Sequence, residues 1–133
     1  MPGATMTELA PWRFGPIEPV ALERLAVVLD DPNPIHLDAD AVAALGLGDR
    51  PVNQGPANVG YVLTMLGEIG PDATVERIDV RFLENVFAGD RVVGGGEIER
   101  DLGETRVGCR VWLDVEGGGR ALEGSAVVRV TAW

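Results

Sequence analysis

The sequence of 133 residues is short of several residue types on which common catalytic and metal sites depend. One cysteine, Cys109, and one histidine, His36, exclude an internal disulfide and a zinc site with an ordinary ligand set. No lysine is present, which excludes Schiff-base chemistry and a phosphate-binding loop of the usual kind. The single serine, Ser125, lies in a strand-like segment rather than in a nucleophile elbow. Any catalysis must therefore come from carboxylates, amides, backbone donors and His36.

Charge and hydrophobic patterning exclude further classes of protein. With 21 acidic and 11 basic residues the formal net charge is −10, which argues against sequence-independent binding to nucleic acid or to anionic membranes. No apolar run reaches the ~18 residues of a membrane-spanning helix, and residues 1–5 lack the basic and apolar regions of a signal peptide. The length and a hydrophobic content of 46% fit one globular domain over residues 1–133. We expect a cytoplasmic protein.

Prolines and aspartates mark the elements of the first third of the chain. We expect no regular structure before Pro11. A helix is predicted to begin at Pro19 and to end at residues 30–34, where two prolines remove backbone donors. Asp38 is expected to cap a short helix that runs through Leu45.

The longest predicted helix runs over residues 56–69. Gly55 is a plausible N-cap, Pro56 suits the first helical position, and the dipeptide at 70–71 stops the helix. Its apolar residues extend nearly all round, which is typical of a buried helix.

The hydrophobic period changes from 3.6 to 2 after this helix. Alternation predicts four strands, over residues 77–82, 90–98, 105–115 and 122–130, with glycine-containing turns between the later ones. We predict that they form an antiparallel meander whose apolar face is covered by the long helix. The fold class is therefore α+β, a single hot-dog fold in which a sheet wraps around a buried helix.

Residues that can carry chemistry are concentrated between positions 31 and 36. The order Asp31-Pro32-Asn33-Pro34-Ile35-His36 places a carboxylate and an imidazole in a loop stiffened by two prolines. A general acid–base pair requires such a fixed separation. The alternative is that Asp31 and Asn33 only form Asx turns and that His36 is a surface residue.

At this segment the sequence resembles the MaoC-type hydratases, which include (R)-specific enoyl-CoA hydratases and hydroxyacyl dehydratases. Their signature reads Asp-x-Asn-Pro-[Ile/Leu]-His and is followed by a short helix, a turn and the long hot-dog helix. The resemblance extends from about Pro19 to Val130. It implies hydration of a trans-2-enoyl thioester, carried by coenzyme A or an acyl carrier protein, to the (R)-3-hydroxyacyl product. It also implies no cofactor beyond the carrier and no metal.

The resemblance assigns roles residue by residue. Asp31 and His36 match the catalytic pair, and Asn33 matches its supporting amide. Gly55 matches the glycine at the start of the hot-dog helix, whose N–H faces the thioester oxygen. Three departures bear on substrate identity: the family's Ser-Gly before the aspartate is Leu29-Asp30, its His-Gly is Gln54-Gly55, and Pro56 removes one backbone donor.

Substrate binding is predicted for Gln54 and Ala57, beside Gly55, and for Arg77 and Arg81, which could meet the phosphates of coenzyme A. For each arginine a solvated surface position remains the alternative. The resemblance further implies a homodimer or a heterodimer with another hot-dog subunit, as in heteromeric actinobacterial hydratases. Two rival functions stay open: a hot-dog thioesterase, for which Glu68 is the carboxylate on the long helix, and a partner-dependent subunit of a heteromeric hydratase.

Overall fold

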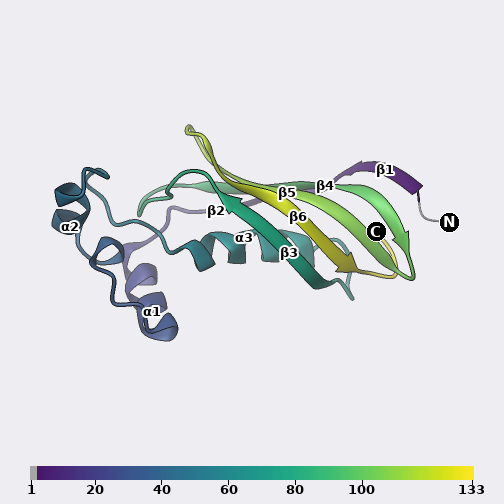
Figure 1. Ribbon diagram of the computed structural model, residues 1–133, viewed down its shortest axis with the longest axis horizontal. Coiled ribbons are helices and arrows are strands. Elements are labelled where there is room, and N and C mark those ends of the chain that lie inside the picture. The colour runs from purple at the N-terminus through teal and green to yellow at the C-terminus, as the bar shows by residue number, and fades with distance from the viewer. Residues whose placement is uncertain (1–2) are drawn as a thin grey trace.

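The computed structural model describes residues 3–133 and consists of a curved six-stranded antiparallel sheet with one long helix in its concave face (Figure 1). The strands are β1 (Gly3–Glu8), β2 (Trp12–Phe14), β3 (Thr74–Phe82), β4 (Val92–Gly103), β5 (Arg106–Val115) and β6 (Arg120–Arg129). The helices are α1 (Pro19–Leu29), the 3₁₀ helix η1 (Pro34–His36), α2 (Ala39–Ala44) and α3 (Gly55–Gly67). The predicted α+β class and hot-dog arrangement are confirmed.

The order of the strands differs from the predicted meander. The sheet runs β1-β4-β5-β6-β3, and β2 pairs with the first part of β4. Only β4, β5 and β6 form a meander, whereas β3 pairs with β6 and lies at the far edge. Alternation of apolar residues identifies the buried face of a strand and not its neighbour, so the sequence pattern could not place β3.

The expectation that the segment before Pro11 has no regular structure is wrong. Residues 3–8 form β1, which pairs with β4 through Thr7 opposite Ile98 and Glu8 opposite Glu97. This pairing satisfies backbone groups of β4 that would otherwise form an exposed sheet edge. The first two residues lie outside the described part of the chain.

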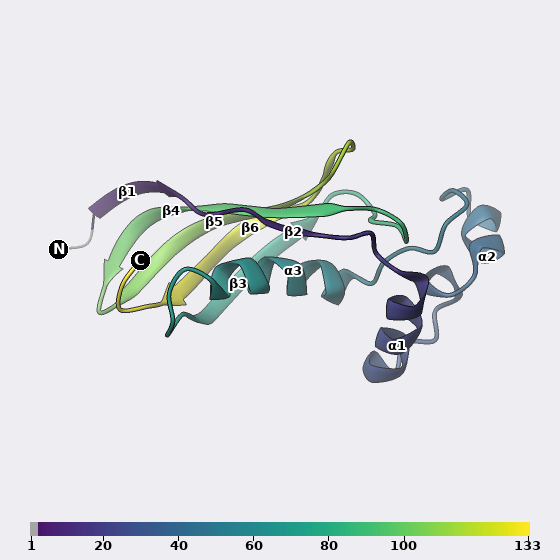
Figure 2. The same cartoon turned by 180° about the vertical axis from the view of Figure 1, so that it is seen from behind.

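The core lies between α3 and the concave face of the sheet, as the view from behind shows (Figure 2). Val62, Met65 and Leu66 of α3 are buried in this core, but Leu63 on its other side is 38% exposed. The helix is therefore covered on one side and not all round as predicted. Burial raises the pKa of the Cys109 thiol to about 11, with a smaller contribution from the Glu99 carboxylate, so Cys109 is an inert core residue. The buried strand residues that face α3 include Ile98, Val107, Val111, Leu113, Leu122, Ala126 and Val128.

Glycines in β4 allow close packing on both faces of the sheet. A Cβ on Gly94 would lie 3.6 Å from the Cβ of Met65, so α3 packs directly against the backbone of β4. A Cβ on Gly95, on the opposite face, would overlap the indole of Trp112. Arg110 and Arg120 lie over that indole at 5.6 and 5.0 Å. The glycine run that weakens the alternation signal in the sequence is therefore required by packing.

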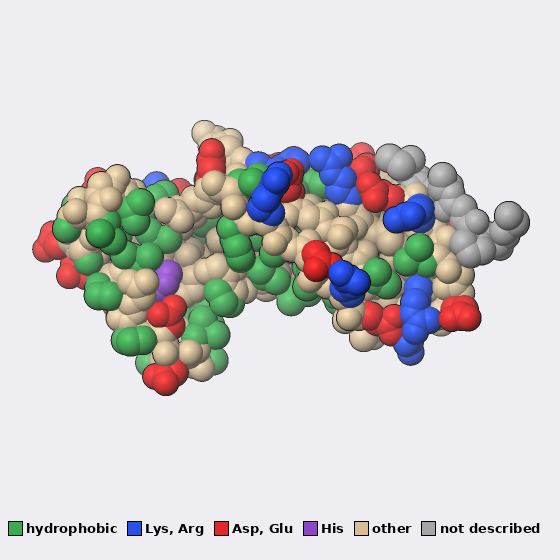
Figure 3. Space-filling view, in the orientation of Figure 1, with side chains coloured by type: hydrophobic (Ala, Val, Ile, Leu, Met, Phe, Trp, Pro, Cys, Tyr) green, Lys and Arg blue, Asp and Glu red, His purple; other side chains and the backbone are tan. Residues whose placement is uncertain are grey.

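The segments between β2 and α3 form a helical end beyond the sheet, which contains α1, η1 and α2 (Figures 1 and 2). In the space-filling view apolar side chains gather over this end, and most of the visible arginines lie over the strands (Figure 3). The N–H of Val52 donates to Ile35 O at 2.8 Å, and the N–H of Asn53 donates to Val86 O at 2.7 Å. These bonds hold the loop before α3 between η1 and the segment that follows β3. No helix in residues 3–133 has the length and apolar character needed to cross a membrane.

Candidate active site

The loop that carries Asp31 is shaped by hydrogen bonds to its own backbone. Helix α1 ends at Leu29, and its C-cap, Asp30, has a left-handed φ of 50° and is exposed. Asp31 Oδ1 accepts from the N–H of Asn33 at 3.2 Å, and Asn33 Oδ1 accepts from the N–H of Ile35 at 3.3 Å. Both Asx turns considered in the sequence analysis are thus present. They fix the direction of the Asp31 carboxylate.

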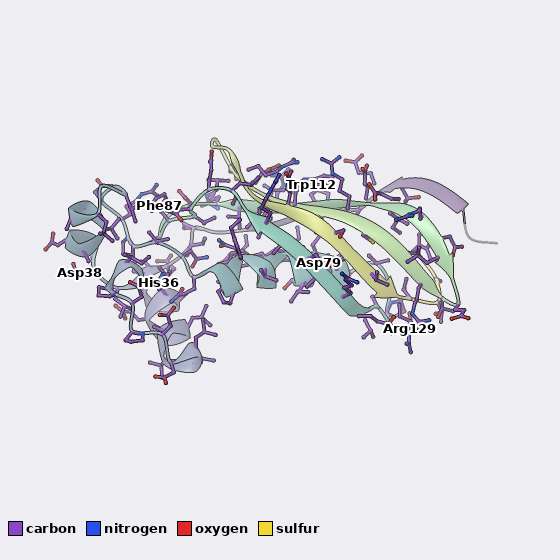
Figure 4. All side chains as sticks on the ribbon, viewed as in Figure 1. His36, Asp38, Asp79, Phe87, Trp112 and Arg129 are labelled. Atoms are coloured by element: carbon purple, nitrogen blue, oxygen red, sulfur yellow. The ribbon has the colours of Figure 1, made fainter. Side chains whose placement is uncertain are left out.

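The imidazole of His36 is held from one side and faces Asp31 on the other. Its Nδ1 donates to Val52 O at 2.6 Å, and the residue is 9% exposed. Its Nε2 lies 3.4 Å from Asp31 Oδ2. When the proton on Nδ1 is donated to Val52 O, a neutral imidazole presents a lone pair at Nε2. Two acceptors, His36 Nε2 and Asp31 Oδ2, then face the same space. A water placed there can donate one proton to each. Figure 4 shows His36 within the helical end, to the left of α3.

His36 opens into a cavity of about 380 Å³, called here the His36 cavity, whose wall also contains Asn53, Gly55, Asn58 and Phe82. Within residues 3–133, no partner is recorded for the N–H of Gly55, the first residue of α3. The positive end of the α3 dipole lies at the same place. The structure therefore brings His36 and Gly55 to one cavity and places Asp31 in contact with the His36 imidazole.

Two asparagines missed by the sequence reasoning, Asn53 and Asn58, line the same cavity and form a hydrogen-bond network with Tyr61. Asn53 Nδ2 donates to Asn58 Oδ1 at 2.9 Å and to the Tyr61 hydroxyl at 3.1 Å. Burial raises the pKa of Tyr61, and the hydrogen bond with Asn53 partly offsets this. The signal in the sequence was a pair of asparagines flanking the start of an otherwise apolar helix.

A second cavity of about 580 Å³ lies between α1 and α3 and is called here the α1–α3 cavity. Its wall is largely apolar and includes Val20, Leu25 and Val28 of α1 together with Ala57 and Tyr61 of α3. Asn53 borders both cavities, and Gly55 of the first turn of α3 lines the first of them while Ala57 lines the second. Ala57, predicted as a substrate-binding residue, faces this second cavity rather than the first.

The predicted arginines lie elsewhere. Arg77 pairs with Asp79 at 2.7 Å and Arg81 pairs with Glu123 at 2.7 Å, all on exposed or half-buried positions of the strands. Neither arginine lines the His36 cavity or the α1–α3 cavity. In Figure 4 Asp79 lies over the middle of β3, away from His36. Both arginines therefore lie at solvated surface positions, the alternative considered in the sequence analysis.

Gln54 is the most deeply buried polar residue near the site. It is 0% exposed, and its Nε2 donates to Leu22 O at 2.9 Å, which ties α3 to α1. Its Oε1 is buried without a hydrogen-bond partner. The side chain is absent from the walls of both cavities, so the residue predicted to bind substrate joins two helices instead.

The buried amide of Gln54 predicts opposite effects of two substitutions on stability. Gln54→Met removes the unpaired oxygen and keeps the volume, so we expect an unfolding free energy within about 1 kcal/mol of the wild type or higher. Gln54→Glu places a carboxylate in the same site, and we expect a loss of several kcal/mol. Urea unfolding followed by circular dichroism measures both. Equal destabilisation by Met and Glu would show that the amide is required for packing.

The carboxylate required by the thioesterase alternative is remote from the site. Glu68 is the exposed C-cap of α3, and 13 helical residues separate the two ends of the helix by about 20 Å. Among residues 3–133 no three His, Cys, Asp or Glu side chains cluster in a way that could hold a metal ion. His36 supplies the imidazole of the His36 cavity, and Asp31 is the carboxylate in contact with that imidazole. The exposed residue Glu84 also lines the cavity wall.

Comparison with known proteins identifies the family and the fold. The family model of the MaoC-like domain matches residues 5–109, and no curated protein matches the sequence significantly. The fold is similar to an (R)-hydratase from A. caviae involved in PHA biosynthesis (TM-score 0.85, 23% identity, 94% of this chain and 95% of that chain). It is also similar to R-hydratase PhaJ1 from Pseudomonas aeruginosa (0.82, 20%, 97% and 90%) and to the ChsH1–ChsH2 complex from Mycobacterium tuberculosis (0.80, 18%, 94% and 96%). Because the family model covers most of the sequence, the chain belongs to the MaoC-like hydratase and dehydratase family.

Proposed function

We propose that the protein adds water to a trans-2-enoyl thioester to give the (R)-3-hydroxyacyl thioester, and that it catalyses the reverse dehydration. The observation that carries the proposal is the separation of 3.4 Å between Asp31 Oδ2 and His36 Nε2, together with the cavity that His36 and Gly55 both line. General acid–base catalysis needs such a pair within reach of one water.

In the proposed reaction a water lies between Asp31 and His36. The pair takes one proton from the water as its oxygen forms a bond to C3 of the acyl chain. The π electrons of the C2–C3 bond form a C1–C2 double bond while those of the carbonyl move to the thioester oxygen, and the resulting enolate is protonated at C2 by the pair. One water is added and no net proton is consumed. Both new bonds form on the same face because water and proton come from the same pair.

The developing enolate oxygen requires hydrogen-bond donors. The unused N–H of Gly55 and the positive end of α3 are suited to this task, and one such donor contributes roughly 3 kcal/mol in other enzymes. Asn33 supports the pair through its backbone, because its N–H holds Asp31 Oδ1. The α1–α3 cavity, with its largely apolar wall, is suited to the acyl chain.

The proposed substrate carrier is coenzyme A or an acyl carrier protein, with no further cofactor. We also propose that the chain works as a dimer with a second hot-dog subunit, identical or related. Two features support this: one side of α3 is uncovered at Leu63, and β3 is an unpaired sheet edge. A heteromeric structure, the ChsH1–ChsH2 complex, is among the similar folds.

The test is an assay of the purified protein with trans-2-enoyl-CoA substrates of several chain lengths. We expect loss of the absorbance of the conjugated thioester and formation of the (R)-3-hydroxy product by chiral analysis. Free thiol is measured in parallel with a thiol reagent. Release of thiol without hydration would contradict the proposal in favour of a thioesterase, and (S) product would contradict the proposed geometry.

A further inference from the structure

The first turn of α3 offers few backbone donors to an oxyanion. Pro56 has no N–H, and the N–H groups of Ala57 and Asn58 both donate to Gln54 O, at 3.0 and 3.3 Å. Only the N–H of Gly55 is unused among the described residues of this turn. Oxyanion sites are built from backbone N–H groups, from asparagine and similar side chains, or from both. A second donor at this site must therefore come from a side chain.

Asn58 has a buried side chain with an unused donor. The residue is 3% exposed, and its Oδ1 accepts from Asn53 Nδ2 at 2.9 Å. No partner for its Nδ2 is recorded in residues 3–133. That nitrogen is also not sealed from solvent, since Gln54 Oε1 is the single sealed side-chain atom without a partner in that range. The space that Asn58 lines is the His36 cavity, so the free amide hydrogens face it.

The position of Asn58 on α3 directs this donor toward Gly55. Residues three apart on a helix share a face, and each Cα–Cβ bond is tilted toward the helix N-terminus. The Asn58 side chain therefore leans over the turn that begins at Gly55. Both residues line the cavity that contains His36.

Asn53 holds the amide of Asn58 in one orientation. Asn53 is 5% exposed, its N–H donates to Val86 O at 2.7 Å, and its Nδ2 also donates to the Tyr61 hydroxyl at 3.1 Å. With Oδ1 of Asn58 engaged by this fixed donor, the Nδ2 group is left for the cavity. Such a donor needs no reorganisation during the reaction.

We propose that Asn58 is a catalytic residue whose Nδ2 donates a second hydrogen bond to the thioester oxygen, beside the N–H of Gly55 and in place of the donor that Pro56 lacks. The proposal rests on the hydratase function proposed above. The oxyanion site would then have two donors, the N–H of Gly55 and the Asn58 side chain, where the helix backbone alone supplies one.

Two substitutions of Asn58 remove the donor in different ways. Asn58→Asp keeps the shape and the oxygen that Asn53 binds, and Asn58→Leu keeps the volume without charge. We expect kcat to fall by about 100-fold or more in both, with KM changing by less than about fivefold, because the hydrogen bond strengthens as the oxyanion forms. Thr64→Ala, on the same helix and outside both cavities, is the matched control, and we expect it to keep wild-type kinetics.

A second readout does not depend on turnover. The probe is 4-(dimethylamino)cinnamoyl-CoA, an enoyl thioester whose absorbance shifts to longer wavelength when its carbonyl accepts hydrogen bonds. We expect a red shift on binding to the wild type and to Thr64→Ala, and a shift reduced by about half in Asn58→Leu, since one of two donors is lost.

The outcomes separate this proposal from the proposed function. A wild type that shows the Asn58-dependent shift but hydrates no enoyl-CoA would overturn the hydratase function and support the assignment of Asn58. Hydration with normal kcat in both folded Asn58 variants would overturn the assignment. So would a reduced kcat with an unchanged shift, which would place Asn58 at the water or in packing, and so would the absence of any shift in the wild type.

Discussion

Asp31→Asn and His36→Ala are each expected to lower kcat for enoyl-thioester hydration by at least about 100-fold, the scale on which a positioned acid or base contributes. Asp31→Asn keeps the shape of the side chain but removes an acceptor that faces His36 Nε2 at 3.4 Å. His36→Ala removes the other acceptor together with the bond from Nδ1 to Val52 O. Steady-state kinetics at several chain lengths measures both losses.

Two further variants separate chemistry from folding in this experiment. Asp30→Asn removes the same charge one residue earlier, from an exposed position. Asparagine tolerates the left-handed backbone conformation found there, so we expect nearly wild-type kcat. His36→Asn retains a donor near the position of Nδ1 while it removes Nε2, and we expect the same loss as for alanine. Wild-type rates in folded Asp31→Asn and His36→Asn proteins would place the chemistry elsewhere.

Gly55→Val is expected to lower kcat by about 100-fold, the effect of losing one oxyanion donor. A Cβ at Gly55 would approach the ring of Phe82 to 3.2 Å across the wall of the His36 cavity. The branched side chain therefore crowds the space in front of the N–H that the thioester oxygen must reach. Phe82 is exposed and can turn aside, so the fold should tolerate the change.

Gly60→Val is the matched control for this substitution. Gly60 lies on the same helix, lines neither cavity, and has nothing within 4 Å of an added Cβ. Valine is also a better helix former than glycine, so we expect unchanged kinetics and equal or higher thermal stability. Unchanged kinetics in a folded Gly55→Val protein would remove Gly55 from the site.

Local signals in the sequence were sufficient for most of the elements. Pro19 begins α1, the Asp38 side chain caps α2 by accepting from the N–H of Asp40, and Gly55 begins α3 as its first residue rather than as its cap. These features depend on residues close in sequence, where backbone donors and proline geometry decide the conformation. The buried face of each strand could also be predicted, because alternation depends on residues that are close in sequence.

Long-range pairings were not predicted because nothing local encodes them. The pairing of β3 with β6 and of β1 with β4 joins segments far apart in the chain. For β3 the alternation already indicated that Arg77 and Arg81 lie on one face of the strand and that Ile78 and Val80, which pack on the core, lie on the other face. The two arginines lie on the solvent face of β3, and contact with a carrier phosphate stays a prediction.

The candidate site divides in the same way. Asp31 and His36 were identified because one proline-stiffened loop contains both. Asn53 and Asn58 were missed, because they join His36 only through the contact of the loop before α3 with η1. Their roles depend on burial and on a hydrogen bond between them, and neither is visible in a list of residues. Asn33 was assigned to the pair through its side chain, whereas that side chain caps η1.

The central claim is that Asp31 and His36 act as one unit on one water, and a double-mutant cycle tests it most directly. The kcat of wild type, Asp31→Asn, His36→Asn and the double variant is measured with one enoyl-CoA under saturating conditions. The account predicts that the double variant loses little more than the worse single variant, since either change disables the shared water. Losses that multiply, so that the double variant falls by the product of the two single effects, would show two independent contributions and contradict the account.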